Sequence, residues 1–292
     1  MLTSLLGLIL LTLRELWAKK IVMGLFLIST LVLLLAAFAL NLDVVEGSLA
    51  GIQVFGQEAV SPGEMEVPED GEDVEAMQDM MTLDRVVLMI ESAVAGATYW
   101  IGILLALFAV APLFTRLLQP GHIDLLLSKP MSRLQLISGH TLGVWITMLI
   151  LAVYLLGGLW LIMSIKTGVW NFSFLLSILV VVGMFAVMYA PIMFMGVWTQ
   201  STALALITTY GLIFVSMFLA GGETLATQLG TVSEPIFWGL YHTLPNFTEV
   251  TMVISALAQA EPVASWYPLL SSLFFAAVLY AASVVWFAHR DF

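Results

Sequence analysis

Residues 172–220 read FSFLLSILVVVGMFAVMYAPIMFMGVWTQSTALALITTYGLIFVSMFLA, and this stretch decides the fold class. The wider run from Thr167 to Gly222 contains no Asp, Glu, Lys or Arg. A helix needs only about 20 apolar residues to cross a membrane, so this run is too long for a single crossing. The polar segment Thr199–Thr202 divides it. The stretch therefore predicts two spans, at Phe172–Trp198 and Ala203–Ala220.

Four more uncharged apolar runs predict four further spans. The chain is 61% hydrophobic and 10% charged, whereas a soluble domain is about 25% charged. The runs are too long and too uniform for the strands of a transmembrane barrel. We therefore predict an all-α fold, a polytopic transmembrane helical bundle of six spans that occupies residues 1–292 as a single domain. The four runs are Ile21–Leu42, Ser92–Thr115, Leu136–Ile165 and Leu269–Ala288.

The basic residues predict the orientation of the bundle. With six spans, seven of the nine Lys and Arg residues fall on one side of the membrane and two on the other. Basic loops stay in the cytoplasm, so the first side, with both termini, is expected to be cytoplasmic. We expect a multi-pass protein of the plasma (inner) membrane. The seven are Arg14, Lys19, Lys20, Arg116, Lys129, Arg133 and Arg290, and the two are Arg85 and Lys166.

Residues 1–18 predict an interfacial helix on the cytoplasmic leaflet, because their apolar residues gather on one side of a helical wheel. The alternative is a ragged extension of the first span. No basic region precedes the apolar stretch, so a signal peptide is not expected. The apolar face holds Leu2, Leu5, Leu6, Ile9, Leu10, Leu13, Leu16 and Trp17, the polar face holds Thr3, Ser4, Gly7, Arg14 and Glu15, and Leu11 is out of place.

Two long segments are expected on the outer side. Residues 43–91 contain a dense acidic stretch and predict a mobile or partly ordered loop. Its carboxylates lack the spacing of a calcium-binding loop, so a solvated acidic loop is favoured. Residues 223–268 are more apolar and predict short helices at the outer surface or dipping into the membrane, broken by Pro245 and Pro262.

The hairpin at residues 119–133, between the second and third predicted spans, has an unusual composition. Pro120 and Gly121 are expected to end the second span, and Ile123–Leu127 predict a short amphipathic helix that Lys129-Pro130 terminates. Ser132 is placed to cap the next helix, and Arg133 is expected to face the cytoplasm or lipid phosphate. Apolar residues on a cytoplasmic hairpin indicate a docking surface. The alternative is that Leu125–Leu127 lie among the lipid headgroups.

This hairpin resembles that of the membrane-spanning permease subunits of ABC transporters, of the exporter-like type with six helices. The family pattern is an acidic residue, a glycine turn, a short apolar helix and a leucine-serine-lysine-proline-x-serine-arginine run. The chain departs from it at Gln119, where the family has glutamate, and at His140, where it often has lysine. Phe287 and the terminal Arg290–Phe292 are also similar to the family's end. The matching residues are Gly121, Asp124, Leu127, Ser128, Lys129, Pro130, Ser132 and Arg133.

The resemblance implies a permease that works as a homodimer or heterodimer with two cytoplasmic ABC ATPase subunits docked on the hairpin. ATP is then bound by the partner, and no catalytic, cofactor or metal site is expected in this chain. The sequence agrees that ATP chemistry lies elsewhere, because it contains no G-x-x-x-x-G-K-[ST] loop. The implied ATPase-coupling residues are Gly121, Asp124, Leu125, Leu126, Leu127, Ser128, Lys129, Pro130 and Arg133.

Two other classes of function stay open from the residues alone. An ion-coupled secondary transporter normally needs an ionisable side chain inside the membrane, and the centres of the predicted spans contain none. A non-transporting membrane anchor of a larger complex fits the same hydropathy. The four histidines lack zinc-ligand spacing, and nine basic residues make no patch for nucleic acid. Gly139 and Gly143 are spaced for close helix contact at the start of the third span. The substrate is not indicated.

Overall fold

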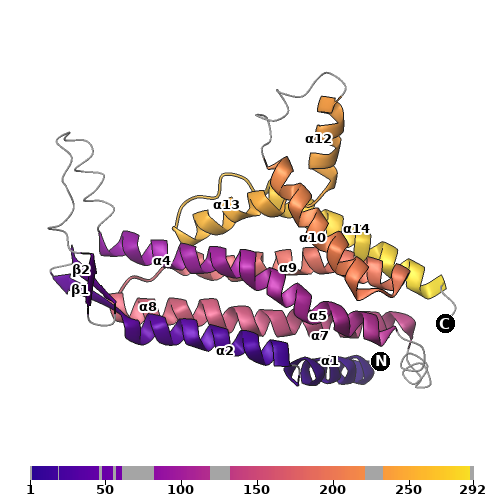
Figure 1. The fold of residues 1–292 in the computed structure, drawn as a ribbon, viewed down its shortest axis with the longest axis horizontal. Helices are drawn as coiled ribbons and strands as arrows, with labels where there is room; N and C mark the ends of the chain where they lie inside the picture. The colour runs from indigo at the N-terminus through magenta and orange to yellow at the C-terminus, as the bar shows by residue number, and fades with distance from the viewer. Residues whose placement is uncertain are drawn as a thin grey trace.

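The computed structural model describes residues 2–18, 20–45, 48–54, 57–60, 82–118, 132–220 and 233–289. Within these residues the protein is a bundle of long helices that lie side by side (Figure 1). The N-terminal helix and the C-terminal end of the last helix lie toward the same end of the bundle.

The described residues form the following helices, with π-helical turns (η) inside three of the long ones. They are α1 (Leu2–Trp17), α2 (Lys20–Leu34) with η1 (Leu35–Ala39), α4 (Leu83–Ala97) with η2 (Thr98–Gly102) and α5 (Ile103–Leu117), α7 (Arg133–Ala152) with η3 (Val153–Gly157) and α8 (Gly158–Thr167), α9 (Phe172–Thr199), α10 (Thr202–Leu219), α12 (Ser233–Thr243), α13 (Phe247–Ala258) and α14 (Tyr267–His289).

Five helical segments of the described chain are long and apolar enough to cross a membrane. A sixth is obtained when the bent pair Gly7–Trp17 and Val22–Phe38, whose axes differ by 69°, counts as one span. The prediction of an all-α polytopic bundle is confirmed, with five or six candidate spans. The five are Leu83–Leu117, Arg133–Thr167, Phe172–Thr199, Thr202–Leu219 and Tyr267–His289.

The segment between the first two spans differs from the loop that was predicted for residues 43–91. Residues 40–45, 48–54 and 57–60 form a three-stranded antiparallel sheet of β1 (Leu40–Val45), β2 (Ser48–Val54) and β3 (Gln57–Val60). Helix α4 begins at Leu83, not Ser92, with Asp84 in its first turn, where a negative charge favours a helix N-terminus. The rest of the predicted loop, residues 61–81, lies outside the described residues.

Helix α9 forms the centre of the bundle. It packs against α5, α7, α10, α13 and α14, and Met184, Phe185, Met188, Tyr189 and Ile192 on it are fully buried. A long helix that is apolar all round needs neighbours or lipid on every side. The central position of α9 supplies those neighbours.

The segment between α10 and α14 contains the predicted short helices. Helices α12 and α13 flank Pro245, and α13 ends before Pro262. Helix α13 packs between α4 and α9, and Phe247, Val250 and Ile254 are buried there. In Figure 1, α12 projects from the bundle while α13 lies along it. The segment therefore dips into the bundle.

Candidate functional site

The predicted ATPase-coupling hairpin is described only at its base. Gly121, Asp124, Leu125, Leu126, Leu127, Ser128, Lys129 and Pro130 lie outside the described residues. Ser132 caps α7 as predicted: its hydroxyl accepts a hydrogen bond from the Gln135 amide at 3.2 Å, and the Gln135 side chain accepts one from the Ser132 amide at 3.1 Å. This reciprocal capping box fixes the point at which the hairpin enters α7.

Arg133 ties the base of the hairpin to the end of α14. One of its guanidinium nitrogens donates to the backbone carbonyls of Phe287 at 3.4 Å and Ala288 at 3.3 Å. A cation at the C-terminus of a helix is favoured by the helix dipole. These bonds attach Arg133 to the C-terminal end of α14, and the prediction that Arg133 faces the cytoplasm or lipid phosphate stays a prediction.

The other flank of the hairpin is joined to α10. The hydroxyls of Thr115 on α5 and Thr202 on α10 share a hydrogen bond, and the Gln200 side chain reaches the Leu118 carbonyl at 3.5 Å. The two ends of the hairpin are therefore held by different helices, α10 on one side and α14 on the other.

Helix α1 lies against the first half of α7, at Gly139 and Gly143. A Cβ added at Gly139 would lie 2.9 Å from the Leu8 Cβ, and one at Gly143 would lie 2.7 Å from the Thr12 Cβ. Real Cβ atoms do not approach so closely, so only glycine fits at both positions. The predicted close helix contact is confirmed, and the partner helix is α1.

The buried face of α1 differs from the predicted apolar face. Leu8, Thr12 and Leu16 are buried, whereas Leu10 and Leu11 are exposed. Thr12 tolerates burial because its hydroxyl donates to the Leu8 carbonyl at 3.0 Å, within the same helix. The buried face shares Leu16 with the predicted apolar face, and the prediction that the apolar face rests on lipid stays a prediction.

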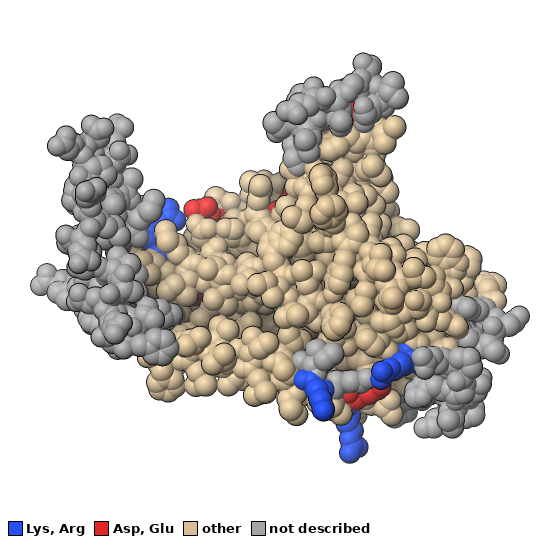
Figure 2. Space-filling view, in the orientation of Figure 1, with Lys and Arg blue, Asp and Glu red and all other residues tan. Residues whose placement is uncertain are grey.

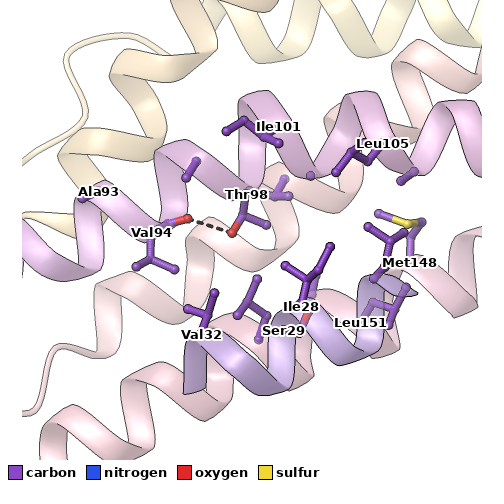
Figure 3. Close-up of a pocket in the computed structure, with 17 residues that line it drawn as sticks. Ile28, Ser29, Val32, Ala93, Val94, Thr98, Ile101, Leu105, Met148 and Leu151 are labelled. Atoms are coloured by element: carbon purple, nitrogen blue, oxygen red, sulfur yellow. Dashed lines mark hydrogen bonds between the residues drawn. The ribbon is translucent and has the colours of Figure 1, made fainter. Parts of the chain in front are cut away.

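A hollow of about 400 Å³ lies between α2, α4–α5 and α7, and we call it the intramembrane hollow (Figure 3). Leu25, Ile28, Ser29 and Val32 of α2 form one wall, and α4, η2 and α5 form the opposite wall from Ala93 to Ala106. Met148 and Leu151 of α7 close it. Among the residues that line it, only Ser29 and Thr98 carry a polar side-chain atom. No sequence motif pointed to it.

A buried carboxyl lies on α4, where none was predicted inside a span. Glu91 is fully buried, and its Oε2 accepts a hydrogen bond from Asn171 Nδ2 at 2.9 Å. The same Nδ2 donates to the carbonyl of Ala258, the last residue of α13, at 2.7 Å. Glu91 and Asn171 thus join α4, α9 and α13, and we call them the outer clasp.

The sequence carries a signal for Glu91 that hydropathy alone misses. Glu91 shares the buried stripe of α4 with Leu83, Val87 and Ala95, at intervals of four residues. Such spacing places all four side chains on one helix face. The prediction assigns Glu91 to the loop and begins the span one residue later, at Ser92, so the predicted span does not include this stripe.

Two groups of charged side chains are visible on the face drawn in Figure 2. Lys and Arg side chains, with an acidic side chain among them, gather near α1, and a smaller basic group lies beside acidic side chains toward the opposite end. An ion pair of Arg85 and Glu261, 3.6 Å apart, lies near the start of α4. Among the described residues no group of three or more His, Asp or Glu side chains is placed to hold a metal ion.

The α12–α13 junction holds a half-buried tyrosine–glutamate pair. The Tyr241 hydroxyl donates to the Glu249 carboxylate, 2.8 and 2.9 Å from its two oxygens. Burial, followed by this hydrogen bond and by the charges of Glu249 and Tyr267, raises the pKa of Tyr241 above its usual value. The pair braces α12 against α13.

A comparison with protein families gives one match. A family model described as ABC-2 family transporter protein matches residues 11–292, nearly the whole chain. No curated protein and no solved structure matches the chain.

Proposed function

We propose that this chain, which belongs to the ABC-2 family of transporter proteins, forms the translocation pathway of an ATP-driven transporter as a dimer. In this proposal it is coupled to separate ATPase subunits through the hairpin at residues 119–133. The chain is a multi-pass membrane permease by family and by its apolar helices. The dimer, the ATPase contact and the inner-membrane location are our proposal.

The observation that carries the coupling role is the way the base of the hairpin is attached. Its two ends continue directly into α5 and α7, which belong to segments of 35 residues each. At 1.5 Å per residue each segment is about 50 Å long, more than the roughly 30 Å of bilayer hydrocarbon. A force applied to the hairpin would therefore act on two helical segments that are each long enough to cross the whole membrane.

The contacts at the hairpin base would spread such a movement to other helices. Arg133 links α7 to α14, Thr115 links α5 to α10, and Gly143 seats α1 on α7. We propose that nucleotide-driven closure of the ATPase subunits pulls on the hairpin and shifts α5 and α7 together. ATP hydrolysis takes place in the partner chain, and this subunit is non-catalytic.

The buried carboxyl of Glu91 is an observation that favours an ion-coupled secondary transporter. A carboxyl inside a span often marks a proton or ion pathway, because placing a charge there is costly. Here, however, it contacts Asn171 and lies on a packed helix face between α4, α9 and α13. We assign Glu91 to the packing of these helices, and family membership supports the ATP-driven alternative.

The docking test is the substitution Leu126→Glu, compared with Leu11→Glu. Loss of one leucine from a buried contact costs about 1.5–3 kcal/mol, enough to weaken assembly tenfold or more, and a buried unpaired carboxylate costs more. Leu11 is 56% exposed, which makes it the matched control, whereas Leu8 packs on Gly139.

We would measure the membrane level of the permease, co-purification of the ATPase and ATP turnover for both variants. The proposal predicts normal insertion for both and loss of the ATPase for Leu126→Glu alone. If Leu126→Glu keeps its ATPase and full turnover, the hairpin does not dock the ATPase.

A further inference from the structure

We propose that the intramembrane hollow holds one acyl chain of a bilayer phospholipid, inserted between α2 and α4–α5. The hollow lies on the described part of the chain, away from the hairpin. This inference goes beyond the proposed function, and it does not depend on ATPase coupling.

The chemistry of the walls excludes a polar occupant. The Thr98 hydroxyl donates to the Val94 carbonyl at 2.7 Å (Figure 3), so its proton is already used within its own helix. The Ser29 side chain is buried, and no lining residue is charged. A polar ligand would lose its hydrogen bonds to water without replacement, and apolar cavities also do not retain water. The occupant must be hydrocarbon.

The shape of the hollow fits a slender chain parallel to the spans. Along α4–α5 its lining runs from Ala93 to Ala106, about 20 Å at 1.5 Å per residue. One leaflet contributes about 15 Å of hydrocarbon, half of the bilayer core. The hollow is therefore long enough to span the acyl layer of one leaflet, and it runs in the same direction as the acyl chains.

The hollow opens on a surface that lipid covers. Ile28 and Ile101 line it and are 54% and 61% exposed, whereas Met148 and Val181 on the inner side are buried. These residues lie in the middle parts of their spans. The medium at the mouth is therefore bilayer hydrocarbon, which supplies acyl chains at high local concentration.

A π-helical turn explains why the protein itself does not fill this space. Residues Thr98, Ile101 and Gly102 of η2 form part of the wall, and η3 contributes Leu155. A π turn inserts one residue into the helix and shifts the side chains that follow, and such turns are frequent at functional sites. With Ala93, Ala97 and Gly102 facing the hollow, small side chains leave room along the whole wall.

The test uses the full chain in nanodiscs of phosphatidylcholine, doped with phosphatidylcholine that carries a diazirine in one acyl chain. After irradiation, mass spectrometry maps the lipid adducts. We expect several-fold more labelling on α2 and α4–α5 at the hollow than on the exposed face of α14, where Phe274 is 73% exposed. Equal labelling of the two surfaces would overturn the proposal, whatever the variants do.

A filling variant and its control complete the test. Ala97→Phe places a ring in the hollow, whereas Ala277→Phe adds the same ring to the exposed face of α14, outside the hollow. Labelling at the hollow should fall to the level of the α14 face only in Ala97→Phe, and unchanged labelling would contradict the proposal.

The chain has no cysteine, so a disulfide between two copies of Ile28→Cys would show that a second copy, not lipid, covers the hollow. Because neither ATP nor an ATPase is present, the result is independent of the coupling proposal.

Discussion

Replacing Asn171 with alanine removes three hydrogen bonds at the outer clasp. Asn171 Nδ2 donates to Glu91 and to the Ala258 carbonyl, and Oδ1 accepts from the Phe174 amide at 3.3 Å. Asn171 itself is buried, so water does not readily replace these bonds. The substitution also removes the hydrogen bond to Glu91 Oε2. Glu91 Oε1 already has no hydrogen-bond partner among the described residues, so neither carboxyl oxygen would then have one.

The expected loss of unfolding free energy follows from the buried polar groups that the substitution leaves without a hydrogen-bond partner. A buried polar group without a partner costs about 1–3 kcal/mol. Some relaxation at the outer end of the bundle reduces the total, so we expect a loss of about 3 kcal/mol. This corresponds to a melting temperature lowered by roughly 5 °C or more. Because Ala258 ends α13, amide hydrogen exchange should rise across Phe247–Ala258 before the rest of the bundle opens.

Two further variants separate the clasp from simple helix capping. Ser201 also caps a helix, by accepting from the Leu204 amide at 3.4 Å, and it is not fully buried. Ser201→Ala should therefore cost about 1 kcal/mol and leave α13 protected. The double variant Glu91→Met with Asn171→Leu also removes the buried carboxyl and should recover the part of the loss that comes from Glu91, whereas the Ala258 carbonyl and the Phe174 amide still lack Asn171. Equal melting temperatures for Asn171→Ala and Ser201→Ala, with no change in exchange at α13, would refute the clasp.

Three other predictions follow from the topology, the α1–α7 contact and the α12–α13 junction. Ser128→Cys should resist, and Ser61→Cys should accept, an impermeant maleimide on intact cells, and the reverse pattern would invert the topology. Gly143→Val should overpack the α1–α7 contact and destabilise the protein by about 1–3 kcal/mol in thermal unfolding. The control Gly183→Val should cost less, because an added Cβ there meets nothing within 4 Å. Equal losses of stability would contradict the contact. Because the pKa of Tyr241 is raised in the folded state, its contribution to stability is fully present below the unfolded pKa of about 10 and is lost as the pH rises above that value. Alkaline unfolding of the wild type and of Tyr241→Phe should therefore differ. An identical pH dependence for the two proteins would contradict the prediction.

Hydropathy predicted the long helices well because lipid imposes one simple rule on each of them. The predicted span Phe172–Trp198 and helix α9 differ by one residue at one end, since charge-free length is what the bilayer requires. The same rule fails at Glu91. A single carboxyl can lie inside a span when another helix supplies a donor, and that donor, Asn171, is distant in sequence.

The features that depend on several helices could not be read from the sequence. The intramembrane hollow is formed by side chains from α2, α4–α5 and α7, and no one of these segments carries a distinctive motif. The three-stranded sheet differs from the predicted loop because acidic residues such as Asp43 are typical of loops. In the structure the backbone of Asp43 pairs with that of Gly51, and this pairing organises the segment. The coupling hairpin stays a prediction, supported by the family and by the contacts at its base.

The contact between α1 and α7 also has a consequence for biosynthesis. Gly139 follows Leu8 by 131 positions in the chain. At about 5–20 residues per second, the ribosome needs roughly 7–26 s to produce the groove after it has produced the helix that fills it. During that interval the apolar side chains of α1, Leu8 and Leu16 among them, have no protein partner on α7. The nascent helix would then rest on the membrane surface or be held by a chaperone until the third span arrives.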